Sequence, residues 1–141
     1  MSDRIAVMNK GRLEQVGAPE DIYEKPATRF AAEFVGAGNF FEGSGDGRIF
    51  RTTDGLSFEA PASGDAVILV RPEKMKIAPG AGVACRVEEV LYQGASRSII
   101  LKAGERRLFV EDANDGLSAR VRVGEATAVS WRPEDGLVLH P

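Results

Sequence analysis

Residues 83–111 read VACRVEEVLYQGASRSIILKAGERRLFVE, and their pattern predicts three consecutive β-strands over residues 83–92, 96–102 and 106–111. Apolar side chains alternate with others at the start of the first strand, at Val83, Cys85 and Val87. A period of two gives a strand one inward and one outward face. Two adjacent acidic residues, Glu88 and Glu89, interrupt the alternation and predict a β-bulge there.

A similar strand-like pattern extends over most of the chain beyond Gly38. Short apolar segments alternate with turn residues about every 8–12 residues, a spacing that favours a small barrel or sandwich. Asp54-Gly55 between two such segments is a strong hairpin signal. The further strands that we expect are residues 39–42, 48–52, 56–59, 66–71, 74–78, 119–123, 127–131 and 137–139.

The first 38 residues have a different pattern. Residues 4–8 and 13–16 flank a turn and predict a β-hairpin. Pro19 then starts a short helix, which Pro26 ends. A second helix is expected over residues 28–35, with an apolar stripe along one face: Phe30, Ala31, Phe34 and Val35.

A tripeptide occurs twice in the same context. Arg71-Pro72-Glu73 follows one expected strand, and Arg132-Pro133-Glu134 follows another; each precedes a further strand. Proline fixes a turn, and the Arg and Glu of each copy are able to pair across it or with a backbone carbonyl. We therefore predict two similar structural R-P-E corners.

The composition excludes several classes of protein. With 141 residues, 43% of them hydrophobic and 28% charged, the chain is globular rather than disordered. A net charge of −3 gives little electrostatic support for nucleic-acid binding. No apolar run approaches the roughly 20 residues of a membrane helix. The first residues lack the apolar segment of a signal peptide, and a single cysteine fits a reducing compartment.

No catalytic, cofactor-binding or metal-binding residue is predicted. The chain has no GxxxxGK[ST] phosphate loop, and its single histidine, His140, is expected to be solvated near the end of the chain. The Gly-rich residues 43–47 are interpreted as a hairpin loop. Glu111, Asp112 and Asp115 favour a solvated loop over a cation site, because they lack the spacing of a calcium loop.

Other polar and aromatic candidates also have simpler structural interpretations. The arginines at 106, 107, 120 and 122 could contact an anion, but the outward faces of strands routinely carry such residues. Cys85 alternates with apolar residues and is expected in the core. For Trp131, core packing is favoured over a role as a base-stacking platform.

A family resemblance emerges from longer segments. Residues 4–26, RIAVMNKGRLEQVGAPEDIYEKP, followed by FAAEFVG at 30–36 and NFF at 39–41, resemble the end of the nucleotide-binding domain in ATPase subunits of bacterial ABC importers. The remainder, with VRPE at 70–73, LYQG at 91–94 and SWRPED at 130–135, resembles the TOBE (transport-associated OB) domain of those subunits. The resemblance implies a mainly β fold, an OB-like small barrel preceded by a hairpin and two helices. It divides the chain into residues 1–38, a remnant of the nucleotide-binding domain, and residues 39–141, the TOBE domain.

The resemblance also implies a function. The family's ATPase motifs precede the matching segment, so this chain is expected to be non-catalytic and without ATP or Mg, which the parent subunit binds. The implied role is regulation and dimerisation in an importer, with polyamine-type favoured over ferric-iron, phosphonate or sugar importers. The alternatives are a small-anion (oxyanion) binding OB module and an OB-type nucleic-acid binder.

The same resemblance suggests partners and a location. Expected partners are a second copy of the chain, membrane permease subunits reached through the ATPase domain, and a small-molecule or protein effector. Nucleic acid is not expected. The location is cytoplasmic, peripheral to the inner face of the bacterial plasma membrane. Apolar residues of the N-terminal part would be left for association with a neighbour: Ile5, Val7, Phe30, Phe34 and Val35.

Overall fold

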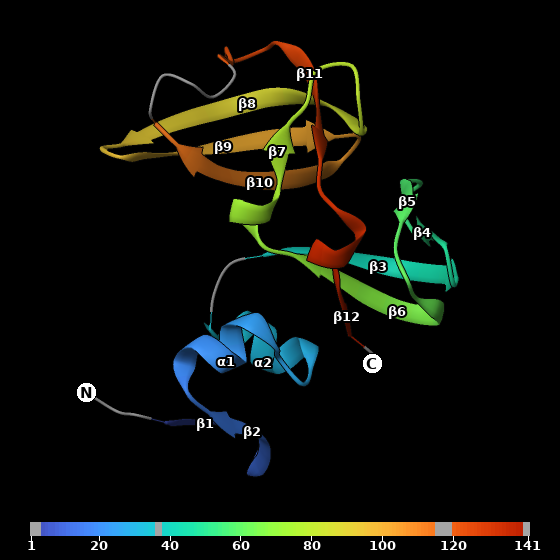
Figure 1. Cartoon of the computed structure of the whole chain (residues 1–141), viewed down its shortest axis with the longest axis vertical. Coiled ribbons are helices and arrows are strands. Elements are labelled where there is room, and N and C mark those ends of the chain that lie inside the picture. The colour runs from blue at the N-terminus through green and yellow to red at the C-terminus, as the bar shows by residue number, and fades with distance from the viewer. Residues whose placement is uncertain (1–3, 36–37, 115–119, 140–141) are drawn as a thin grey trace.

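The computed structural model describes residues 4–35, 38–114 and 120–139, although nothing is described of the side chains at 34 and 35. A hairpin and two helices lie at one end of the molecule, and two curved antiparallel sheets form the rest (Figure 1). The protein is therefore mainly β, with a curled, half-barrel arrangement of strands. This confirms the expected OB-like fold class.

The N-terminal unit has the predicted elements. The hairpin turns at Lys10 and Gly11, both with positive φ (51° and 80°), the backbone geometry of a tight two-residue turn. Thr28 Oγ1 accepts a hydrogen bond from the Ala31 N–H at 3.1 Å and so satisfies one free donor at the start of the second helix. The elements are β1 (Ile5–Asn9), β2 (Arg12–Gly17), α1 (Pro19–Glu24) and α2 (Arg29–Val35).

The hairpin covers the two helices and has a small core of its own. Val7, Ile22 and Ala31 are fully buried together, and Ile5 packs against them. Each of the three comes from a different element, so the N-terminal unit buries apolar surface without another domain.

The first sheet has the strand order β12-β6-β3-β4-β5. Its long central pair, β3 and β6, is in register from Asn39 opposite Val70 to Asp46 opposite Ser63. The bounds are β3 (Asn39–Asp46), β4 (Ile49–Thr52), β5 (Ser57–Glu59), β6 (Ser63–Val70) and β12 (Leu137–Leu139).

The second sheet has the order β10-β9-β8-β11-β7. The register between β8 and β9 shifts between Val87 and Glu89, which confirms the predicted bulge. The bounds are β7 (Lys76–Ile77), β8 (Val83–Gln93), β9 (Ser96–Ala103), β10 (Arg106–Ala113) and β11 (Ala126–Ser130).

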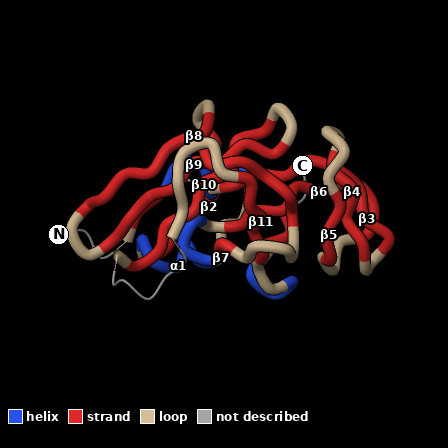
Figure 2. The backbone as a smooth tube through the Cα atoms, turned by 90° about the horizontal axis from the view of Figure 1, so that it is seen from above, coloured by secondary structure: helices blue, strands red, loops and turns tan. Residues whose placement is uncertain are grey.

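A single large core lies between the two sheets. Its largest members are Phe41 and Phe50 from the first sheet and Leu101 and Leu108 from the second. Trp131 stacks on Phe41 with ring centroids 5.5 Å apart, as expected for a core aromatic residue. Seen from above, β5 lies on the side of its sheet nearer to β11 (Figure 2).

Two expectations were wrong. The expected strand 119–123 is absent from its described part, residues 120–123, because the chain turns instead: Gly124 has φ 89°, and the Glu125 N–H bonds to Arg122 O at 3.0 Å. The Gly-rich residues 43–46 belong to β3 rather than to a loop. A Cβ at Gly43 would lie 2.1 Å from Arg51 O, so this glycine lets neighbouring backbone approach closely within the sheet.

Candidate functional site

The two R-P-E segments form the same local structure. In each, the arginine is extended (φ −70°, ψ 147° at Arg71; φ −80°, ψ 145° at Arg132) and the proline begins one turn of 3-10 helix. Proline suits this first position because its missing N–H would have no partner there. Both segments contain such a turn, at Pro72–Lys74 and at Pro133–Asp135.

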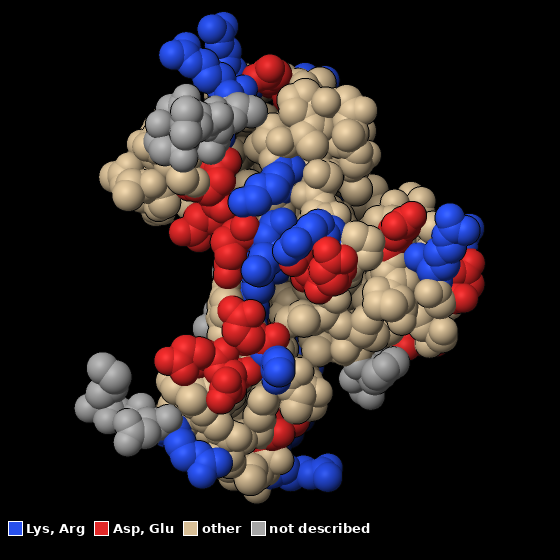
Figure 3. All heavy atoms as spheres, viewed as in Figure 1, with Lys and Arg blue, Asp and Glu red and all other residues tan. Residues whose placement is uncertain are grey.

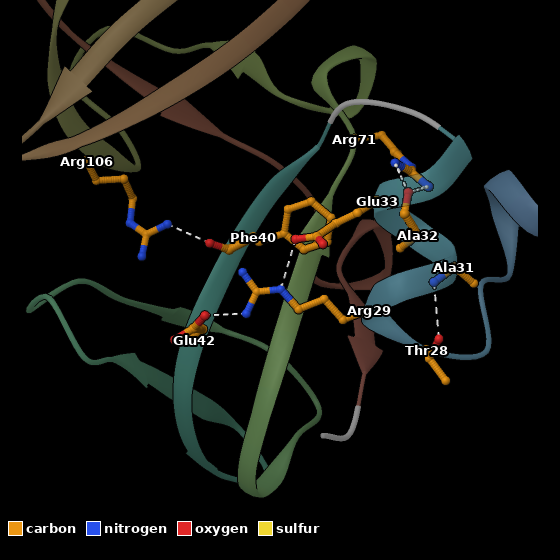
Figure 4. A network of polar contacts seen from close by, with 9 residues as sticks. All are labelled: Thr28, Arg29, Ala31, Ala32, Glu33, Phe40, Glu42, Arg71 and Arg106. Atoms are coloured by element: carbon orange, nitrogen blue, oxygen red, sulfur yellow. Dashed lines mark hydrogen bonds and ion pairs between the residues drawn. The ribbon is translucent and has the colours of Figure 1, made fainter. Parts of the chain in front are cut away.

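The first corner joins the β-structure to the N-terminal helices. Arg71 is only 4% exposed, and its Nη2 donates to Tyr23 O at 3.1 Å. Both of its terminal nitrogens also donate to Ala32 O in α2, each at 3.5 Å (Figure 4). The guanidinium also lies 4.1 Å from the centre of the Tyr23 ring, a cation–π arrangement. One side chain thus contacts both helices.

The glutamate of the same corner completes this joint. The Tyr23 hydroxyl donates to the Glu73 carboxylate, at 2.6 and 2.9 Å from its two oxygens. Burial and the bond to Glu73 raise the pKa of Tyr23 well above its ordinary value, so the phenol stays a neutral donor. Burial lowers the pKa of Arg71 from a very high starting value. Tyr23, Arg71 and Glu73 are called the corner joint below.

The second corner is used differently. Arg132 pairs with its own turn, at 3.2 Å from Asp135 and 3.4 Å from Glu134. The Arg132 and Glu134 side chains are largely exposed, so these ion pairs stabilise little more than the turn itself. The same tripeptide therefore makes a connection between units at one corner and only a local turn at the other.

Two further arginines connect elements near the joint. Arg29 of α2 pairs with Glu33 and with Glu42 of β3, and it lies over the Phe40 ring at 5.3 Å (Figure 4). Arg106 of β10 contacts the other sheet. It reaches Asp54 Oδ2 and Phe40 O, each at 2.6 Å, and its bond to Asp54 holds the pKa of that carboxyl below its usual value. Arg106 thus makes structural contacts between the two sheets, and Arg107 pairs with Glu88 at 3.1 Å.

An open cavity of about 270 Å³ adjoins the second corner. Trp131 and Phe58 form much of its apolar wall, with ring centroids 5.1 Å apart in an edge-on arrangement. Glu59 is the one charged residue in the described lining. The lining residues come from β5, from the start of β8 and the residue before it, from the end of β11, and from the second corner that follows it: Ser57, Phe58, Glu59, Gly82, Val83, Val129, Ser130, Trp131 and Pro133.

Basic residues line a second hollow, of about 350 Å³, near the end of β8. Arg97 is buried there and forms two bonds to Asp112, at 2.6 and 3.1 Å. Arg120 and Arg122 also line it, both exposed, together with Tyr92. The guanidinium group of Arg97 is bound to Asp112, so the exposed groups of Arg120 and Arg122 are the ones that offer a place for an anion.

Two of the three acidic candidates, Glu111 and Asp112, lie in the described part of the chain. Asp112 is engaged by Arg97, and Asp115 lies outside the described residues. Over residues 4–35, 38–114 and 120–139, no group of three His, Cys, Asp or Glu side chains could hold a metal ion. Acidic side chains do gather on both rims of a hollow between the N-terminal unit and the second sheet (Figure 3). This hollow has a volume of about 690 Å³, and Glu73, Glu111 and Asp112 are among the residues that line it.

The apolar residues proposed for association have different environments. Val7 is fully buried under the helices and Ile5 is half-buried, so this face of the hairpin is already covered; expecting Val7 to be open for association was wrong. Phe30 is 36% exposed, and the side chains of Phe34 and Val35 lie outside the description. The exposed apolar residues of the hairpin are others, which the sequence analysis missed: Met8, Leu13 and Val16.

Cys85 is a core residue, as expected. Burial raises the pKa of its thiol to about 11, which leaves it in the unreactive protonated form at neutral pH. His140 lies outside the described residues. In the part of the chain that is described, no helix has the length and hydropathy needed to cross a bilayer.

Comparison with known proteins gives consistent relatives. The model of the TOBE domain family matches residues 68–139. The spermidine/putrescine import ATP-binding proteins PotA of Rubrobacter xylanophilus and PotA 1 of Pseudomonas aeruginosa are 43% and 35% identical, over 99% of this chain and 41% of each relative. The uncharacterized ABC transporter ATP-binding protein YdcT of Escherichia coli is 38% identical over 93% of this chain and 37% of its own length.

The chain thus spans about two-fifths of the length of these relatives. The family match begins in β6, includes both R-P-E corners and the whole second sheet, and ends in β12. Because this match covers more than half of the chain, the protein belongs to the TOBE domain family.

Proposed function

We propose that this chain acts as the non-catalytic, C-terminal regulatory and dimerisation region of the ATP-binding subunit of a polyamine-type ABC importer. Residues 1–38 would be the end of the nucleotide-binding domain, and residues 39–141 the TOBE domain. ATP and Mg would bind elsewhere in the parent subunit. The names of the relatives support the importer class and favour spermidine or putrescine as the solute.

The corner joint is the observation that carries this proposal. A regulatory domain must be coupled to the part that it regulates, and Arg71 and Glu73 hold both helices of the N-terminal unit. A movement of α1 or α2 would therefore reach the TOBE domain through Tyr23 and Ala32. An effector that binds one arrangement better than the other would shift the balance between them.

The proposed partners follow from this role. A second copy of the chain would dimerise with it, and membrane permease subunits would be reached through the nucleotide-binding domain. A small molecule or a protein would act as effector. The complex would lie in the cytoplasm, at the inner face of the plasma membrane.

A chimera tests the proposal. This chain would replace the matching segment of the Rubrobacter relative, and ATP hydrolysis would be measured with and without permease and solute. We expect the chimera to hydrolyse ATP, the chain alone to show no turnover, and the Arg71→Ala chimera to lose permease-dependent control. Arg132→Ala, at the corner that pairs only with itself, is the matched control. ATP turnover by the purified chain alone would contradict the proposal.

A second function is favoured by the hollow lined with Arg97, Arg120 and Arg122. Guanidinium groups bind oxyanions well, so we infer a second role as a small-anion binding module. Calorimetric titration with sulfate and molybdate tests it, with an oligonucleotide as the comparison. Tight oxyanion binding that Arg120→Ala abolishes would support this function, and salt-sensitive oligonucleotide binding would instead indicate a nucleic-acid binder.

A further inference from the structure

The cavity beside Trp131 has an unpaired strand edge along one wall. β5 is the last strand of its sheet and pairs only with β4, with Phe58 opposite Phe50 and Ser57 opposite Arg51. Backbone bonds flank this pairing on both sides, from the Thr52 N–H to Leu56 O at 2.8 Å and from the Ala60 N–H to Arg48 O at 2.9 Å.

These two bonds determine which backbone groups of β5 are free. Opposite residues in an antiparallel pair alternate between bonded and non-bonded pairs. Leu56 and Ala60 bond to β4, so Phe58 does too, and the N–H and C=O groups of Ser57 and Glu59 point to the other side. That side is the free edge of the sheet, and both residues line the cavity.

The rest of the cavity suits a side chain rather than a charged ligand. Trp131, Val83 and Phe58 are half-buried and present apolar surface, while Val129 is fully buried behind them. Glu59 is exposed at the edge, and no ion pair is formed by it among the described residues. An apolar group would fill the cavity, and a cation beside it would be attracted to this carboxylate.

We propose that the free edge of β5 and the Trp131 cavity bind an extended peptide of a partner protein, with an apolar side chain in the cavity and a lysine or arginine beside Glu59. The backbone groups of Ser57 and Glu59 repeat every two residues, about 6.8 Å along the strand. An extended peptide repeats at the same interval and meets both sets of groups, whereas a small molecule with one amide meets only one. This is peptide recognition by strand addition.

Trp131 allows a direct test, because it is the only tryptophan of the chain. The purified protein would be titrated with a capped pentapeptide of sequence Thr-Lys-Leu-Lys-Thr, and Trp fluorescence would be followed. We expect a saturable shift in the emission. Replacing the leucine by glycine, or both lysines by glutamate, should weaken binding at least tenfold.

N-methylated peptides distinguish strand addition from apolar contact alone. Two peptides would be compared, each methylated on every second backbone nitrogen but on opposite sets. In one phase the methyl groups replace the N–H groups that face β5, which should abolish binding. In the other phase they replace the N–H groups that point away from β5, which should be tolerated. Equal binding of both phases, or no response to any peptide, would overturn the inference. An emission shift that depends on protein concentration without peptide would also overturn it, because a second copy would then occupy the site.

A pair of variants identifies the charged contact. Glu59→Gln should reduce the affinity for the lysine peptide and its salt dependence, whereas Glu89→Gln, on an exposed part of β8 outside the cavity, should change neither. Unchanged binding by Glu59→Gln would refute the assigned contact. A role for this peptide site in regulation rests on the proposed function. Peptide binding without any effect on ATP hydrolysis by the chimera would contradict only that regulatory role.

Discussion

The side-chain amide of Asn39 pairs with the backbone of Phe109 as a neighbouring strand would. Its Nδ2 donates to Phe109 O at 2.9 Å, and its Oδ1 accepts from the Phe109 N–H at 2.8 Å. Asn39 lies at the start of β3 and Phe109 in β10, so one side chain connects the two sheets. The same Nδ2 also donates to Val70 O at 3.1 Å, and Asn39 is 3% exposed. This amide therefore satisfies backbone groups at the edge of β10 that would otherwise lack partners.

Asn39→Ala should destabilise the protein strongly. It would remove the bonds from this buried amide to the part-buried backbone of Phe109 and to the buried Val70 O, which costs about 2–3 kcal/mol in the free energy of unfolding. Urea unfolding followed by circular dichroism measures this change. The control is Asn114→Ala: Asn114 is exposed and bonds only Gly94 O through its side chain, so its removal should cost less than about 0.5 kcal/mol. Equal effects of the two substitutions would contradict a connecting role for Asn39.

The corner joint should appear as energetic coupling between Tyr23 and Glu73. Tyr23→Phe and Glu73→Ala each remove the same hydrogen bond, so the double variant should be about 1 kcal/mol more stable than the sum of the single changes predicts. Unfolding of the four proteins in urea provides the cycle. Tyr23→Phe combined with Glu134→Ala, at the second corner, should be additive. Additivity of both pairs would show that the joint contributes no coupling.

The ion pair between Asp54 and Arg106 should make the stability of the protein depend on pH in the acid range. Its hydrogen bond to Arg106 lowers its pKa in the folded state, so the ionised carboxyl stabilises the protein above the ordinary pKa of 3.8. This contribution is lost as the pH falls from that value through the lowered pKa of the folded state. The stability difference between the natural protein and Asp54→Asn should therefore be present at pH 7 and shrink toward pH 2.5. A difference that stays constant over this range would refute the assignment.

Gly43 tests the close approach of backbone within the first sheet. In Gly43→Ala the new methyl group would meet Arg51 O at 2.1 Å, so β3 and β4 would have to separate. We expect a loss of about 3 kcal/mol, at the upper end of what overpacked cores usually cost. In the Asp54-Gly55 turn, Gly55→Ala meets no atom within 4 Å and should cost only about 1–2 kcal/mol for its positive φ. Thermal unfolding of both variants compares them, and a smaller loss for Gly43→Ala would contradict this explanation.

Local patterns predicted most elements but not all of their limits. Alternation and turn residues located the hairpins, and the acidic pair Glu88-Glu89 located the bulge. The same alternation at Val121 and Val123 suggested a strand, whereas the chain turns there through the bond from the Glu125 N–H to Arg122 O. The glycines at 43 and 45 suggested a loop. In the structure they are needed within a strand because the backbone of other segments lies too close for a side chain, and the sequence does not show such a contact.

The order of residues by itself determined most of the strands, the two helices and the existence of two R-P-E corners, because periodicity and proline act over a few neighbouring residues. Only the tertiary structure decided which corner became a joint, since Arg71 finds Tyr23 and Ala32 about 40–50 residues away while Arg132 finds Asp135 in its own turn. The contact between Asn39 and Phe109 and the free edge of β5 beside Trp131 were decided in the same way. Such partners depend on how distant segments pack around a shared core, and no local pattern encodes that arrangement.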